Sequence, residues 1–289
     1  MLQLPLEQLI EKLSPGHNAH LLGPEVVTPA SNVDEWRPGK LFRCAALDFH
    51  LARGPARLAV SARETTWTVV MPLTGTVDVA IASLTESALL NAGDLVLLAP
   101  GATAQLVLER AASVATLSSP ARSTAPLTTV THEGSGLTQG LSWLIRRDDI
   151  EPALGPRDKV KIAEGNLWRP QSPTGVWKPG TEVLCEALAF GVFRTGAPES
   201  AHQHRRAWEL YHVFDGTLRL NVRDHRLGPW RPVDVATHEA LLLPPGAAHI
   251  VDQESHHLSI AFQAPPSISD REIVSFTPGQ PSLDLPFFD

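Results

Sequence analysis

Four residues in the C-terminal half of the chain have the types and the spacing of a metal site. His202 and His204 are one residue apart, and Glu209 follows five positions later in a stretch that indicates β-strand. His249 comes shortly after the turn PPG, which ends at Gly246. Side chains alternate across a strand, so the first two histidines share a face. Imidazoles with a carboxylate suit Fe²⁺, Mn²⁺, Ni²⁺, Co²⁺ or Zn²⁺. In an octahedral ion, four protein ligands leave two positions for substrate, water or dioxygen.

The pattern as a whole, rather than any one histidine, carries this prediction. A single histidine in a β protein is usually a surface residue or a satisfied core residue, and HxH alone is weak evidence. The glutamate and the PxGxxH turn at matching spacing predict one metal ion. We expect five other histidines not to be ligands, and the first of them to face outward because its parity differs from that of the glutamate. They are His212, His225, His238, His256 and His257.

Five further side chains are candidates for substrate chemistry. Tyr211 is the only tyrosine of the chain, and its parity predicts that it points inward beside the glutamate ligand. Its hydroxyl could orient a ligand or bind substrate; the alternative is a core tyrosine with a satisfied hydroxyl. Arg194 and Arg219 lie on adjoining predicted strands and could bind an anionic substrate with two hydrogen bonds each. Solvated arginines are the alternative. Gln263 and Asn221 are similarly placed.

The strand-rich halves of the chain repeat the same pattern. WTVVMPLTG ends at Gly75 and is followed by the turn APG, whereas WELYHVFDG ends at Gly216 and is followed by PPG. Trp67 aligns with Trp208, and GDLVLLAPG has the same shape as EALLLPPG. A pattern that recurs within one chain indicates a duplicated structural unit. We therefore expect two similar β domains in tandem.

The first copy of the repeat lacks the metal ligands of the second. The aligned positions hold no histidine and no carboxylate, so we expect no metal at this place in the first domain. Its expected role is structural: packing, dimerisation or shielding of the second domain. The aligned residues are Ser61, Arg63, Thr68 and Ala104.

Two motifs of the second copy resemble those of a known family. The pattern HxHx₄Ex₆G, which begins at His202, and the pattern PxGx₂H, which begins at Pro244, are similar to the two motifs of the cupin superfamily. The usual opening glycine of the second motif is replaced by His238, and its closing asparagine is missing. The resemblance covers residues 40–115 and 160–265. It implies a bicupin, two double-stranded β-helix (jelly-roll) barrels.

The rest of the chain is consistent with a mainly all-β fold that has a short N-terminal helix. Residues 4–13 have apolar positions at helical spacing, ended by SPG, and short strands separated by Gly and Pro begin near residue 40. We expect four segments: an N-terminal helix and arm (1–35), a barrel without metal ligands (36–115), a linker with a possible short helix (116–155), and the metal-binding barrel with its tail (156–289).

Composition and charge exclude some partners. The net charge of −7 argues against a nucleic-acid partner, which selects for basic surface. We identify no signal peptide and no membrane-spanning segment, so we expect a cytoplasmic protein. Cys44 and Cys185 are expected to be buried free thiols. We also expect a homodimer, for which residues 4–13 would suit the interface.

Three functions fit these residues. In the first, a dioxygenase-type oxidoreductase binds a small organic substrate and dioxygen at one divalent ion, for which Fe²⁺ is preferred and Mn²⁺, Ni²⁺ or Zn²⁺ are alternatives. In the second, a Zn²⁺ or Mn²⁺ ion polarises a carbonyl or hydroxyl while a base moves a proton. The isomerases that act on 5-keto-4-deoxyuronate resemble this chain in length and in the stretch HQHRRAWELY. In the third, the protein binds a small ligand without catalysis.

Overall fold

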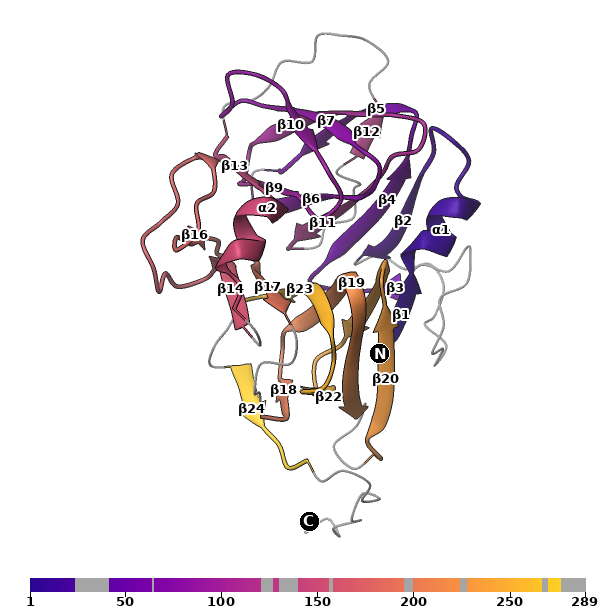
Figure 1. The fold of residues 1–289 in the computed structure, drawn as a ribbon, viewed down its shortest axis with the longest axis vertical. Coiled ribbons are helices and arrows are strands. Elements are labelled where there is room, and N and C mark those ends of the chain that lie inside the picture. Colours follow the sequence, from indigo (N-terminus) through magenta and orange to yellow (C-terminus); the bar gives the residue numbers. More distant parts are fainter. Residues whose placement is uncertain are drawn as a thin grey trace.

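The computed structural model describes nine stretches of the chain, and within them the regular structure is almost entirely β. Figure 1 shows two curled β barrels, one built from the first half of the chain and the other from the second. The helices in these stretches are short: α1 (Leu6–Lys12), α2 (Arg147–Ile150) and the 3₁₀ turn η1 (Glu151–Ala153). The described residues are 1–23, 42–63, 65–120, 127–129, 140–155, 158–194, 200–223, 228–266 and 270–276.

The N-terminal barrel consists of two sheets with an apolar interior between them. The larger sheet has the spatial order β15 (Gly175–Val176), β13 (Ser142–Ile145), β9 (Leu95–Leu98), β6 (Trp67–Thr74), β11 (Ser113–Ser119), β4 (Asp48–Arg53), β2 (Asn18–Gly23) and β3 (Phe42–Arg43). The smaller sheet has the order β12 (Leu127–Thr129), β5 (Ala56–Ser61), β10 (Thr103–Leu108), β7 (Val77–Ile81) and β8 (Ala88–Leu90).

The C-terminal barrel is one continuous, curled sheet. Its main path is β16 (Val183–Leu184), β14 (Asp158–Glu164), β17 (Ala189–Arg194), β23 (His257–Ala264), β19 (Trp208–Arg223), β22 (Ala248–Val251), β18 (His202–His204) and β24 (Arg271–Ile273). Off this path, β20 (Arg231–Ala236) and β21 (Glu239–Leu243) both pair with β19. The first half of β19 pairs with β21 and β23 and its second half with β20 and β22, so this 16-residue strand joins the two walls of the barrel.

The N-terminal segment contacts both barrels. The predicted helix is present as α1, and a strand not predicted from sequence, β1 (Leu2–Pro5), precedes it and pairs antiparallel with β21 of the C-terminal barrel. Leu6, Leu9 and Ile10 on α1 are buried in the cluster between the barrels. The apolar face of the helix is therefore covered within its own chain, and the expected homodimer stays a prediction.

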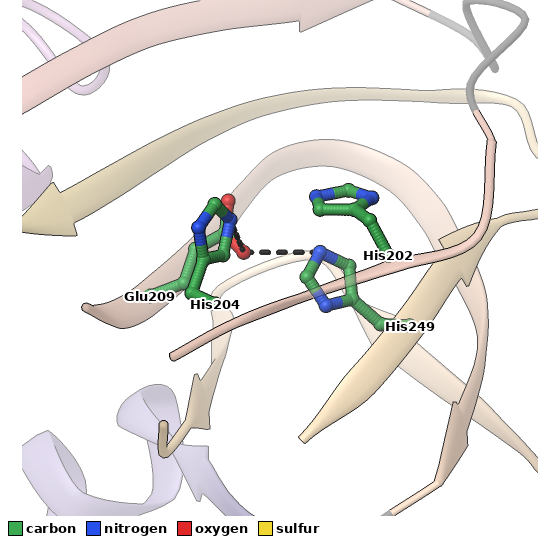
Figure 2. Close-up of side chains that lie close together, drawn as sticks. All are labelled: His202, His204, Glu209 and His249. Atoms are coloured by element: carbon green, nitrogen blue, oxygen red, sulfur yellow. Dashed lines mark ion pairs between the residues drawn. The ribbon is translucent and has the colours of Figure 1, made fainter. Parts of the chain in front are cut away.

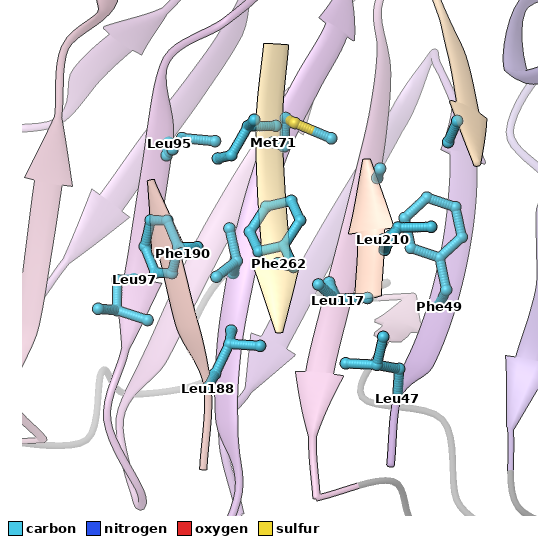
Figure 3. Packing of buried hydrophobic residues seen from close by; sticks show 14 of the residues in the cluster. Leu47, Phe49, Met71, Leu95, Leu97, Leu117, Leu188, Phe190, Leu210 and Phe262 are labelled. Atoms are coloured by element: carbon cyan, nitrogen blue, oxygen red, sulfur yellow. The ribbon is translucent and has the colours of Figure 1, made fainter. Parts of the chain in front are cut away.

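The two barrels pack through the outer faces of their larger walls. Phe49 and Leu117 of the N-terminal barrel belong to the same buried cluster as Phe190, Leu210 and Phe262 of the C-terminal barrel (Figure 3). Two separate clusters fill the barrel interiors. Alternation along each strand thus gives one face to a barrel interior and the other to the shared core.

The segment between the barrels contributes to both of them. After the N-terminal barrel's last long strand, β13 returns to that barrel beside β9, and α2 supplies the short helix that the sequence indicated. The following residues, 158–181, contain β14 and β15. Cys44 and Cys185 are buried and unpaired, which confirms the prediction; burial raises the pKa of the two thiols to about 11 and about 12. Within the described residues, every helix is too short or too polar to cross a bilayer.

Candidate metal centre

The structure brings the four predicted ligands together inside the C-terminal barrel. His202 on β18 lies directly opposite His249 on β22, and Glu209 projects from the start of β19. Glu209 Oε2 is 3.0 Å from His249 Nε2 and 3.7 Å from His204 Nε2. The four candidate ligand atoms all lie within 4.8 Å of one another, and Figure 2 shows the side chains turned toward a common point.

Hydrogen bonds at the far side of each imidazole set its orientation. His202 Nδ1 lies 3.0 Å from the carbonyl oxygen of Ser200, and His249 Nδ1 lies 3.5 Å from that of Ala247. An Nδ1–H that donates to a carbonyl leaves Nε2 with its lone pair free to bind a metal ion. The loop and strand before each histidine therefore fix the nitrogen that faces the centre.

Gln263 has the same role for His204. It lies on β23 opposite Glu209, and its Nε2 is 3.1 Å from His204 Nδ1. Rotating the Gln263 carboxamide by half a turn exchanges the positions of its nitrogen and its oxygen. This flip would place Oε1 beside His204 Nδ1 as an acceptor. In that arrangement, His204 donates from Nδ1 and presents Nε2 to the ion.

Burial and neighbouring charge give these groups the protonation states that metal binding needs. Burial lowers the pKa of His202 to about 3, and it also lowers the pKa of His204. Burial raises the pKa of Glu209, but the adjacent charge of His249 outweighs it, so that this pKa falls to about 2. At neutral pH, two imidazoles are therefore neutral and the carboxylate is ionised, as ligands must be.

The donor set fits a divalent transition metal. Glu209 Oε2 is buried, and no hydrogen bond of good geometry satisfies it although His249 Nε2 lies 3.0 Å away. A buried carboxylate oxygen facing three imidazole nitrogens is a costly arrangement that a cation would relieve. Structural zinc sites are usually rich in cysteine, whereas this set contains none. Imidazole and carboxylate ligands suit Fe²⁺, Mn²⁺, Ni²⁺ or Zn²⁺, and the described residues do not select among them.

A cavity of about 250 Å³ opens onto three of the four ligands, His202, His204 and Glu209. Phe190, Phe193 and Ala261 form apolar parts of its wall. Cationic side chains form another part: Lys161 Nζ lies 2.7 Å from Glu164 Oε2, and Arg271 Nη2 lies 3.2 Å from His202 Nδ1. An apolar cavity with a few converging polar groups is typical of a site for a small molecule.

The comparisons with known proteins identify the fold. No family model matches this sequence, and no curated protein matches it. A cupin 2 conserved barrel domain protein from Leptotrichia buccalis superposes with a TM-score of 0.52 at 11% identity, over 91% of this chain and 95% of that one. The fold is a bicupin. Salicylate 1,2-dioxygenase from Pseudaminobacter salicylatoxidans superposes with a TM-score of 0.51 at 14% identity, over 79% of this chain and 74% of that one. The predicted fold is thereby confirmed.

The structure places Tyr211 at the centre and the two predicted arginines away from it. Tyr211 lines the cavity, and its hydroxyl lies 3.3 Å from His249 Nε2. Arg194 lies 3.6 Å from Glu151, and Arg219 lies 3.8 Å from Asp234; neither arginine lines the cavity. The adjoining strands do carry these arginines, but their side chains lie on surfaces away from the ligands. A role for them in binding an anionic substrate therefore has no support from their positions.

Sequence reasoning missed three cationic residues that do line the cavity: Lys159, Lys161 and Arg271. Lys161 alternates with Lys159 along β14, so the stretch DKVKIAE held a weak signal of one charged face. Arg271 arrives on the three-residue strand β24, which pairs with β18. No local pattern in the C-terminal tail indicates that pairing, because it depends on a contact between distant segments.

The N-terminal barrel corrects the predicted alignment by one residue at two positions. The carbonyl of Ala62 accepts a hydrogen bond from Gly101 N at 2.9 Å, as that of His204 does from Gly246 N at 2.7 Å. Val60 faces Ala104 across the strands, as His202 faces His249. The counterparts of the two histidines are therefore Val60 and Ala62 rather than Ser61 and Arg63, while Thr68 and Ala104 stand as aligned. These counterparts offer no imidazole and no carboxylate.

Proposed function

We propose that this bicupin is a metal-dependent oxidoreductase of the dioxygenase type that acts on a small organic anion. The observation that supports this most is the junction of a three-histidine, one-carboxylate cluster with a cavity that is apolar on one wall and cationic on another. When bound, a redox-active ion such as Fe²⁺ supplies the one-electron chemistry that dioxygen needs.

The residues of this chain would bind and orient the substrate. Arg271 and Lys161 offer charged donors to a carboxylate, and the fork of an arginine suits such a group particularly well. Phe193 and Ala261 would pack against the apolar part of the substrate and exclude water from it. The Tyr211 hydroxyl, 3.3 Å from His249 Nε2, lies where it can hold a proton or donate to a bound oxygen atom of the substrate.

The test is oxygen consumption by protein purified without air and loaded with one equivalent of Fe²⁺. Suitable probes are salicylate, gentisate and a 1,3-diketone. Salicylate is chosen because a salicylate 1,2-dioxygenase has a similar fold. Uptake of one O₂ per substrate, with both oxygen atoms in the product by ¹⁸O₂ mass spectrometry, would support the proposal. No uptake with any ion or probe would contradict it.

The charge of Arg271 provides a sharper test once a substrate is found. Arg271→Gln should raise KM for the anionic substrate about tenfold or more, because a charge-assisted pair is lost, and leave the metal content unchanged. Arg205→Gln is the matched control, since Arg205 is exposed and pairs with Glu272 outside the cavity. Equal KM values in the two variants would remove Arg271 from substrate binding.

A second candidate function is isomerisation of a sugar acid at Zn²⁺ or Mn²⁺. The ion pair of Lys161 and Glu164 in the cavity favours it, because a carboxylate and an ammonium 2.7 Å apart can exchange a proton with a bound carbonyl compound. Such an enzyme would work equally well under nitrogen. Turnover of a keto-deoxyuronate without oxygen, lost in Glu164→Gln, would support this function over the first.

A further inference from the structure

The inner face of the N-terminal barrel carries a second group of potential ligands, on strands that hold none in the C-terminal barrel. His20 on β2 lies directly across from His50 on β4. Asp48 precedes His50 by two positions and so shares its face of the strand. The same face holds Ala52 and Val70, which belong to the barrel's interior cluster. The three polar side chains therefore point into the barrel.

Their geometry converges on one carboxylate oxygen. The two imidazole rings stack with their centroids 4.1 Å apart and only 5° between their planes. His50 Nε2 lies 3.1 Å from Asp48 Oδ1, and His20 Nε2 contacts the same oxygen. The three candidate ligand atoms lie within 4.8 Å of one another, as those of the first cluster do. Two imidazoles and a carboxylate are common ligands of zinc and of other divalent transition metals.

The surroundings are buried on one side and accessible on the other. Asp48 and His50 are both buried, whereas 30% of the His20 side chain is exposed, which provides a path for an ion. Thr116 lies opposite His50 on β11, and its buried Oγ1 has no hydrogen-bond partner among the described residues. A buried hydroxyl without a partner is unusual, and a water or anion bound to an ion here would satisfy it.

Gly23 leaves the space that this arrangement needs. A Cβ atom at this position would lie 2.6 Å from His20 Nε2 and 3.5 Å from Asp48 Oδ1. Any other residue would push the imidazole away from the carboxylate. The glycine therefore holds open the side of the cluster on which His20 sits.

The cluster corresponds in position to a cavity wall of the other barrel. Asp48 pairs with Ser118 on β11 as Ala189 pairs with Gln263 on β23, and Ala189 lines the cavity of the metal centre. If the two barrels are superposed, the His20–Asp48–His50 cluster therefore lies beside the position of the four-ligand centre, but on different strands.

We propose that the N-terminal barrel binds a divalent transition-metal ion, with Zn²⁺ as the preferred probe, through His20, Asp48 and His50. Three protein ligands and an exposed side give an open site that accepts water or a small anion as a further ligand. The site is independent of the four-ligand centre and of the reaction proposed for it.

The experiment separates the two sites by removing the first. The double variant Glu209→Ala/His249→Ala lacks two ligands of the C-terminal centre, and calorimetric titration with Zn²⁺ should show about one remaining equivalent. Adding His20→Ala should abolish that equivalent, whereas adding His17→Ala, an exposed histidine on the same segment, should not. Circular dichroism would confirm that each protein is folded. No binding in the double variant, or undiminished binding after His20→Ala, would overturn the proposal.

A second variant keeps all three ligands and changes only the space between them. Gly23→Ala in the same background should weaken Zn²⁺ binding about tenfold or more, an effect typical of losing a ligand's orientation. Cobalt reports the same change independently, because its visible absorption bands depend on ligand geometry. Unchanged affinity and unchanged cobalt spectra in Gly23→Ala would contradict the role given to His20.

Discussion

Replacing Glu209 with glutamine isolates the charge of the metal centre, because the side chain keeps its length and shape. Glu209 Oε2 faces two ring nitrogens at 3.0 and 3.7 Å and is buried without a satisfying hydrogen bond. Residues that merely orient ligands typically contribute about 10–100-fold to metal affinity. Loss of the only anionic ligand should therefore weaken binding about 100-fold or more, which corresponds to about 2.7 kcal/mol.

The weakened binding has a measurable effect on stability. At a free metal concentration about 100 times the wild-type Kd, binding stabilises the folded protein by about 2.7 kcal/mol. At that same concentration, a variant with about 100-fold weaker affinity gains only about 0.4 kcal/mol. For a chain of this size, the metal-induced rise in Tm should be roughly 5–10 °C in the wild type and about 1 °C in Glu209→Gln.

Thermal scans of metal-free and metal-loaded protein check this in a His20→Ala background, which removes the site proposed for the N-terminal barrel, with Glu164→Gln as the matched control. Glu164 lines the same cavity but pairs with Lys161 rather than with the histidines, so its neutralisation should leave the metal-induced rise in Tm intact. An equal rise in the wild type and in Glu209→Gln would refute the assignment of Glu209 as a ligand. An equal loss in both variants would mean that the net charge of the cavity, not coordination, attracts the ion.

Two further predictions concern one residue beside the centre and one on the opposite face of β19. Gln263→Leu should lower metal affinity about 10–100-fold, since His204 loses the partner that orients it; calorimetry giving an unchanged Kd would speak against this. His212 faces the inter-barrel core, and burial lowers its pKa to about 3. The unfolded state therefore takes up the proton first as the pH falls below about 6.5, and stability decreases by about 1.4 kcal/mol by pH 5.5. His212→Asn should remove this contribution. Urea denaturation of both proteins at pH 7.5 and 5.5 measures it, and an equal loss of unfolding free energy in the two proteins would contradict the prediction.

The part of the site that could be predicted from sequence lies on contiguous strands with strict alternation. Once His202 and Glu209 are placed on strands, parity alone determines that Tyr211 shares the ligand face and that His212 does not. The structure agrees on the face of His212 and adds that this face is buried in the inter-barrel core rather than exposed.

What could not be predicted depends on pairing between distant segments or on loop length. Arg271 reaches the cavity only because β24 pairs with β18, and His20 meets His50 only because β2 pairs with β4. The alignment of the first repeat failed by one residue because its first connection is longer. Six positions separate Ala62 from Thr68 (68 − 62), whereas five separate His204 from Glu209 (209 − 204). A strand pattern fixes parity within a strand but not the length of the turn between two strands.

The two copies of the repeat are alike on their outer faces and different on their inner faces, and packing explains why. Equivalent outer residues lie in the shared core in pairs: Phe49 with Phe190, Val69 with Leu210, Leu97 with Leu242, and Leu117 with Phe262. A polar side chain at any of these positions would be buried between the barrels without a partner, at a cost of about 1–3 kcal/mol. A polar side chain inside a barrel, by contrast, needs hydrogen-bond partners only from the same barrel.

Different polar groups can therefore occupy equivalent inner positions of the two barrels. Thr68, which stands where the other barrel has Glu209, satisfies its hydroxyl with Ser118 at 2.9 Å. Asp48 stands where the other barrel has Ala189, and it satisfies its carboxylate with His20 and His50. Because the outer faces of both barrels pack in the shared core, strand alternation determines which side chains point inward in each barrel. The strands that carry the imidazoles then determine where in that interior an ion can bind.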